Sequence, residues 1–179
     1  MKYSCLMLTQ STIEEIEHAL FNIHVRNPVK LRSTTPGILM KCGLNNLPMY
    51  ENPSHIRKNI LTRQQATDLG LIIGKNDHYH GLGIEIYIKA IAALDDPIAI
   101  LKSTKNNDYV IITEVTDING NKIIIPININ TTTRVNHINI KTNRIKSVYG
   151  KDNVYKYIQN ELKKEKYLLL YTKKHRVRV

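Results

Sequence analysis

The stretch that decides the fold class is residues 98–129, IAILKSTKNNDYVIITEVTDINGNKIIIPINI. Three runs within it are rich in β-branched and apolar residues and show the two-residue period of β-strands; they are 98–102, 109–116 and 122–129. The dipeptide Asn119-Gly120 separates the last two runs and indicates a tight hairpin turn. The stretch therefore predicts an antiparallel meander.

Helices are predicted on the N-terminal side of this meander. Apolar residues at helical spacing predict a helix over 84–94, which ends before Pro97. Start signals, among them the capping box Ser11-Thr12-Ile13-Glu14, predict earlier helices over 12–23 and from Pro36, Pro53 and Thr62. A short strand at 29–31 and loops at 45–52 and 74–83 separate them.

Three more elements are predicted on the C-terminal side: a strand over 136–141, a helix over 152–165 and a strand over 167–172. Helices that are segregated from an antiparallel sheet define an α+β fold. We therefore expect N-terminal helices packed on a twisted antiparallel β-sheet with one late helix, followed by a basic tail at 173–179.

The composition limits the classes of function. The chain has 179 residues, of which 42% are hydrophobic and 23% charged, so it can bury a core. No apolar run approaches the roughly 20 residues that span a bilayer, and no secretory signal is seen, so we expect no membrane contact and a cytoplasmic site of action. The net charge of +11 indicates a polyanionic partner, although a composition biased towards Lys, Asn and Ile would also explain it.

The spacing of the cysteines and histidines does not indicate a metal site or a redox site. Cys5 and Cys42 lack a Cys-x-x-Cys spacing, which suits ordinary thiols in a reducing compartment. His78 and His80 could ligate a metal, but no carboxylate or cysteine stands at ligand spacing from them. We expect no metal and no cofactor.

Two histidines are candidates for proton transfer. His80 precedes Gly81 and a predicted helix, where it could serve as an acid or base or simply cap that helix. His55 lies in the first turn of a predicted helix and is followed by Arg57 and Lys58. Those positive charges and the helix N-terminus suit a phosphate, while the alternative is a solvated helix face.

The sheet supplies the other candidates. Glu114 lies among apolar residues of the predicted strand 109–116, where a carboxylate needs a partner or a role, unless it faces solvent. The segment 143–151, NRIKSVYGK, combines cations, a hydroxyl and a phenol. Such groups suit a phosphodiester, with Arg144 and Lys151 for charge and Ser147 and Tyr149 for orientation, although an ordinary basic strand would look the same.

Ten short motifs, taken in order, resemble the phage MuF-type C-terminal toxin domains, which are grouped with the barnase–EndoU–colicin–RelE (BECR) superfamily of small ribonucleases. The resemblance covers about 29–171. The motifs are Thr35-Pro36 with Leu39, Gly43-Leu44, Leu47-Pro48-Met49, His55-Ile56-Arg57-Lys58, His80-Gly81-Leu82, Asp96-Pro97, Thr113-Glu114-Val115-Thr116-Asp117, Ile124-Ile125-Pro126-Ile127, Asn143-Arg144-Ile145 and Ser147-Val148-Tyr149-Gly150-Lys151.

The resemblance implies a nuclease domain over 29–172, preceded by a helical extension over 1–28. It implies a metal-independent toxin that cleaves RNA, transfer RNA among the candidate targets, and that is usually accompanied by an immunity or antitoxin protein. It places the following catalytic groups in one cleft: His55, His80, Glu114, Arg144, Ser147 and Tyr149. The residues expected to bind the substrate are Arg57, Lys58, Tyr79, Asn143, Lys146 and Lys151.

We therefore expect an endoribonuclease in which the 2′-hydroxyl of RNA attacks the adjacent phosphate, with His80 and His55 in proton transfer and Glu114 as the alternative base. Two other hypotheses stay open. One is a module that binds RNA or an acidic protein without cutting, and the other is a phage protein that inhibits a host factor through contact with an acidic surface. The sequence does not predict the oligomeric state.

Overall fold

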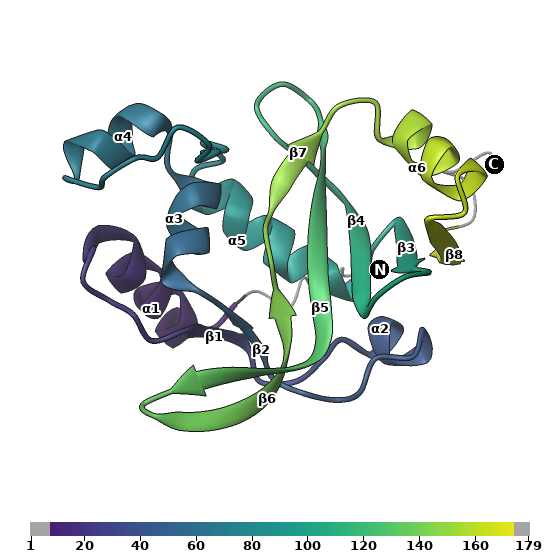
Figure 1. Ribbon diagram of the computed structural model, residues 1–179, viewed down its shortest axis with the longest axis horizontal. Coiled ribbons are helices and arrows are strands. Elements are labelled where there is room, and N and C mark those ends of the chain that lie inside the picture. Colours follow the sequence, from purple (N-terminus) through teal and green to yellow (C-terminus); the bar gives the residue numbers. More distant parts are fainter. Residues whose placement is uncertain (1–7, 174–179) are drawn as a thin grey trace.

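The computed structural model describes residues 8–173, so Cys5 and most of the predicted basic tail lie outside the described residues. The fold is α+β, as predicted (Figure 1). The helices are α1 Gln10–Phe21, α2 Gly37–Lys41, α3 Pro53–Ile60, α4 Arg63–Asp68, α5 Ile84–Ala92 with a 3₁₀ turn at Ala93–Asp95, and α6 Val154–Lys163. The strands are β1 Val29–Arg32, β2 Met49–Glu51, β3 Ala99–Ser103, β4 Asp108–Thr116, β5 Lys122–Val135, β6 Ile138–Ile145, β7 Tyr149–Lys151 and β8 Tyr167–Thr172.

The predicted meander forms the centre of a six-stranded antiparallel sheet, in which five strands follow the order β6-β5-β4-β3-β8 and the sixth, β7, pairs with β5. Strand β5 has 14 residues, and its two halves have different neighbours along one edge. Its first half pairs with β7 and its second half with β6. Strands β6 and β7 therefore follow one another along β5, with an interruption at 146–148.

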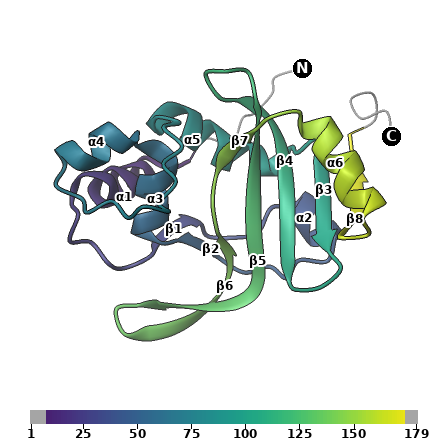
Figure 2. The same ribbon diagram turned by 45° about the horizontal axis from the view of Figure 1, so that its top comes forward.

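Each face of the sheet buries its own core. Helices α1, α3 and α5 cover one face, where Ile56, Ile91 and Ile125 are fully buried. Helix α6 covers the other face near β8, where Val154 and Ile158 pack on Ile112. Figure 2 shows α1, α3, α4 and α5 gathered at one end and α6 at the opposite end, beyond the strands.

Several details differ from the prediction. The N-cap of α1 is Thr9, whose hydroxyl accepts a hydrogen bond from the amide of Thr12, so the proposed capping box at Ser11 was wrong. The expected loop 45–52 contains β2, which pairs with β1. Helix α1 buries Ile16 and Leu20 in the main core, so this part of the predicted N-terminal extension packs with the rest of the fold.

Candidate functional site

The loop that carries His80 is fixed to the end of α3 by backbone hydrogen bonds. The His80 amide donates to the carbonyl of Lys58 at 2.8 Å, and that of Gly81 donates to Leu61 at 3.0 Å. Two more bonds follow, from Leu82 and Gly83 to other carbonyls of this turn. Carbonyls at a helix C-terminus lack partners within the helix, and here residues 80–83 supply them. The chain thereby brings His80 close to the helix that carries His55.

The interruption between β6 and β7 lies opposite this helix. The amide of Lys146 still donates to the carbonyl of Pro126 on β5 at 2.9 Å, whereas Ser147 and Val148 leave the strand geometry. Val148 is fully buried, and this holds the interruption against the core. Irregular positions at sheet edges often redirect side chains towards functional sites. Here the Ser147 hydroxyl turns towards Asn59 of α3.

These segments enclose a pocket of about 200 Å³. Its walls are α3, the loop before α5 and the interruption in the sheet edge. The lining residues are His55, Lys58, Asn59, Asn76, His78, His80, Lys146 and Ser147. Five predicted site residues therefore meet in one place although they come from distant parts of the chain: His55, Lys58, His80, Lys146 and Ser147.

Burial and nearby cations favour the neutral form of the His55 imidazole. Burial lowers its pKa most, and the charges of Lys58 and Arg144 lower it further, against an opposing hydrogen bond with the backbone of Lys146. Its Nδ1 is buried and has no hydrogen-bond partner among the described residues. The neutral imidazole is the form that can accept a proton, and a nitrogen that reaches the pocket would have to do so, because Nδ1 is buried.

The His80 ring stacks on Tyr149, with centroids 5.1 Å apart and planes inclined by 20°. Burial against this ring and the neighbouring His78 lower the pKa of His80. The N-cap of α5 is Gly83, without a side-chain cap, so the capping alternative for His80 does not apply. Tyr149 does not itself line the pocket, but its stack supports the His80 ring that does.

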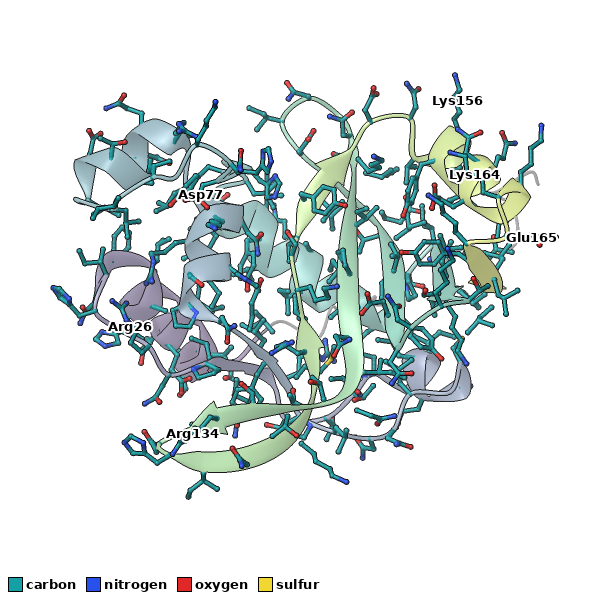
Figure 3. All side chains as sticks on the ribbon, viewed as in Figure 1. Arg26, Asp77, Arg134, Lys156, Lys164 and Glu165 are labelled. Carbon is teal, nitrogen blue, oxygen red and sulfur yellow. The ribbon has the colours of Figure 1, made fainter. Side chains whose placement is uncertain are left out.

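The two lysines of the pocket are held by carboxylates outside its lining. Lys58 pairs with Asp77 at 2.7 Å, and Lys146 pairs with Asp108 at 3.0 Å. Figure 3 labels Asp77 on the loop that faces α3. The bond from Lys58 lowers the pKa of Asp77, which therefore stays ionised at neutral pH. The Lys58 ammonium presents positive charge to an anion in the pocket, and the charges of both lysines act on His55.

Sequence reasoning missed a buried network beneath the pocket. The Ser147 hydroxyl lies 3.2 Å from Oδ1 of Asn59, whose Nδ2 donates to Glu51 at 2.7 Å. The other carboxyl oxygen of Glu51 accepts from the hydroxyl of Tyr87 at 2.5 Å. Glu51 is fully buried, and burial raises its pKa to about 8 against these two bonds. No sequence signal marks it, because its burial depends on the fold.

Three predicted substrate-binding residues lie elsewhere. Arg57 is buried and donates to the carbonyl of Ala19 at 2.6 Å, so it joins α3 to α1. Asn143 is fully buried and bonds to Thr35, among others. Tyr79 packs against the main core. Their polar groups and rings stabilise the helical layer and do not line the pocket.

Two residues of the sheet are also set apart from it. Glu114 pairs with Lys122 at 3.1 Å, and it lies within a register shift of the β4–β5 pairing between Ile112 and Thr116. Because the pocket lining does not include Glu114, the alternative base is not brought to the histidines. The ammonium of Lys151 lies 5.0 Å from the ring centroid of Tyr157, on the α6 side of β7.

Within residues 8–173, no three His, Cys, Asp or Glu side chains gather closely enough to hold a metal ion. No helix of this part of the chain has the length and apolarity needed to cross a bilayer.

Comparison with known proteins adds the family. A family model described as the phage MuF C-terminal domain matches residues 72–178. No curated protein and no solved structure matches the chain. The matched segment supplies His80, Lys146 and Ser147, while His55 and Lys58 come from the preceding residues. Because the match covers more than half of the sequence, the chain belongs to the phage MuF C-terminal domain family.

Proposed function

We propose that this protein is a metal-independent endoribonuclease of toxin type, related to the BECR ribonucleases. The observation that carries the proposal is the meeting of two imidazoles, His55 and His80, with Lys58 and Lys146 in one pocket. Cleavage of RNA through its own 2′-hydroxyl needs a base, an acid and positive charge around the phosphate, and this set provides all three.

In the proposed reaction, the 2′-hydroxyl oxygen bonds to phosphorus while the bond from phosphorus to O5′ breaks. His55 accepts the 2′-hydroxyl proton, because the cations around it favour the neutral ring. His80, on the more exposed side, donates a proton to the departing O5′. The products are a 2′,3′-cyclic phosphate and a 5′-hydroxyl.

Cations of the pocket, together with Arg144 outside its lining, stabilise charge, and Ser147 stabilises geometry. Lys58, Lys146 and Arg144 supply positive charge for the phosphorane, since all three affect the pKa of His55. Charge-assisted hydrogen bonds from such groups to phosphate oxygens are roughly twice as strong as neutral ones. Ser147, fixed by Asn59, orients a phosphate oxygen.

The test is incubation of the purified protein with transfer RNA in EDTA. We expect fragments whose 5′-hydroxyl ends accept phosphate from polynucleotide kinase without prior phosphatase treatment. His55→Ala and His80→Ala should each lower the cleavage rate by about 10²–10⁴-fold. The matched control is His24→Ala, which removes an exposed imidazole outside the pocket and should cleave at the wild-type rate.

Two results would overturn the proposal. Full cleavage by both histidine variants would show that these imidazoles do not transfer protons. A gel shift of intact RNA without fragments would instead make the chain a binding module. Induced expression adds a cellular readout, because a toxin of this type arrests growth and the His80→Ala variant should not.

A further inference from the structure

A second hollow, of about 220 Å³, lies on the flank of α6. Its lining contains three lysines, two amides and one phenol against two carboxylates; the residues are Lys151, Asp152, Asn153, Lys156, Tyr157, Asn160, Glu161 and Lys164. Lys156, Asn160 and Lys164 follow one another at four-residue spacing, so they form one stripe along the helix. The hollow therefore presents cations along its length.

Strand β7 connects this hollow to the pocket of the histidines. Tyr149 stacks on His80 at one end of β7, and Lys151 lines the second hollow at its other end. Two residues of a strand span about 6.6 Å, and their side chains point to the same face. Figure 3 shows the labelled Lys156 and Lys164 on one side of β7 and Asp77 on the other.

Contacts along this path keep the side chains in place. The Lys151 ammonium rests over the Tyr157 ring, which is half-buried on α6. Burial and the nearby hydroxyls of Tyr167 and Tyr149 raise the pKa of Tyr157, so the phenol stays neutral and repels no phosphate. Tyr149, stacked on His80, and Tyr157, in the lining of the second hollow, both pack against the core under α6.

We propose that the hollow bounded by Lys151, Lys156 and Lys164 binds the backbone phosphate of a nucleotide that flanks the cleaved bond in single-stranded RNA. This inference rests on the proposed function, because the flanking position is defined by the bond that is cut at His55 and His80. Lysine ammonium groups bind phosphate as point charges, and the amides of Asn153 and Asn160 can bond to ribose or base edges.

Binding is tested with a fluorescent 2′-O-methyl oligonucleotide of about eight nucleotides, which lacks the attacking hydroxyl and cannot be cleaved. In fluorescence anisotropy at about 0.1 M salt, the double variant Lys156→Ala/Lys164→Ala should raise the Kd about tenfold and lower the salt slope by up to about 2. The matched control, Lys163→Ala/Lys166→Ala, removes equal charge from exposed positions outside the hollow and should change the Kd less than about twofold.

Measurements of cleavage test the second site separately from the proposed nuclease activity. The Lys156→Ala/Lys164→Ala variant should lose about tenfold in kcat/KM on the longer RNA and keep the wild-type value on a dinucleotide, which does not reach α6. Equal weakening by both double variants, no change in either, or no binding of the oligonucleotide by the wild type would overturn the second site. Absence of RNA cleavage by the wild type in EDTA would refute the nuclease, while the anisotropy series would still decide the binding site.

Discussion

The imidazole of His80 lies against the phenol ring of Tyr149 in a stacked arrangement, 5.1 Å between centroids. The two residues are far apart in the chain, and the stack joins the loop before α5 to strand β7. It fixes the plane of a ring that the backbone of His80 alone leaves free to rotate. The contact therefore couples the helical side of the pocket to its sheet side.

Tyr149→Ala should lower kcat/KM for RNA by roughly 10- to 100-fold, because a displaced imidazole loses its alignment with the leaving oxygen. Tyr149→Phe keeps the stack and should stay within about threefold of the wild type. An NMR titration provides a second readout: the pKa of His80 should rise in the alanine variant, where the covering ring is gone, and stay unchanged in the phenylalanine variant. An unchanged rate in Tyr149→Ala would show that the stack has no role in catalysis.

An activated substrate can show which of the two histidines is the general acid and which is the general base. In uridine 3′-(4-nitrophenyl phosphate) the leaving group departs without a proton, so the general acid is dispensable. His80→Ala should therefore lose less than about tenfold on this ester while it loses about 10²–10⁴-fold on RNA. His55→Ala should lose activity on both. If His55→Ala is the variant that the ester rescues, the roles of base and acid are reversed.

The lowered histidine pKa values set the pH dependence of the free enzyme. The base must be deprotonated and the acid protonated, and kcat/KM peaks between their two pKa values. Because both pKa values lie below the ordinary value near 6.5, kcat/KM should peak on the acid side of pH 6.5. A bound phosphate favours both imidazolium ions, so the kcat profile should lie at higher pH. A kcat/KM maximum above pH 7.5 would contradict this assignment.

Glu51 should make the folded protein less stable as the pH rises. Its pKa is raised to about 8 in the folded protein, from 4.5 in the absence of the fold. Between these values the folded state holds a proton that the unfolded state has released, so the free energy of unfolding falls as the pH rises, by at most about 1.4 kcal/mol per unit. Below this window the contribution is fully present.

Urea denaturation at pH 5 and pH 8 measures this effect. Glu51→Gln is neutral at both pH values and should lose less stability than the wild type on going from pH 5 to pH 8. The comparison isolates Glu51, because the histidines titrate in both proteins. Equal losses would mean that Glu51 is ionised in the folded state throughout this range.

The sequence predicted the long strands of the sheet. It did not predict the features that depend on tertiary contacts. Strands β4 and β5 were predicted because runs of β-branched residues flank the Asn119-Gly120 turn. Strand β2 was missed because all three of its residues are buried and no alternation is visible. The register shift near Glu114 was also missed, because the sequence of β4 does not show that three of its residues stand opposite one residue of β5.

Some residues of the candidate site were predicted from the sequence, and others were not. His55, His80 and Ser147 were predicted from residue type and local context, and the structure brings them to one pocket. Glu51 and Asn59 were not predicted, because a carboxylate at a strand end and an amide in a helix turn have no distinctive pattern. Arg57 carries a charge that the sequence assigned to substrate, yet its helix turns it towards the carbonyl of Ala19.

Gly150 lies within β7, and the left-handed residue before α6 is Asn153, with φ 45°. The reason for glycine is space: a Cβ at position 150 would lie 2.0 Å from Oδ2 of Asp117. Asp117 cannot move away cheaply, because its carboxylate accepts hydrogen bonds from the amides of Asn119 and Asn121 in the hairpin turn.

Gly150→Ala should therefore destabilise the fold by about 1–3 kcal/mol, as overpacking does, and displace β7 together with Tyr149 and Lys151. The matched control is Gly37→Ala in the first turn of α2, where an added Cβ meets nothing within 4 Å. That change should leave stability unchanged or raise it by about 0.4–1 kcal/mol. Thermal and urea unfolding of the two variants provide the comparison, and equal stability would show that the hairpin turn yields to the added methyl group.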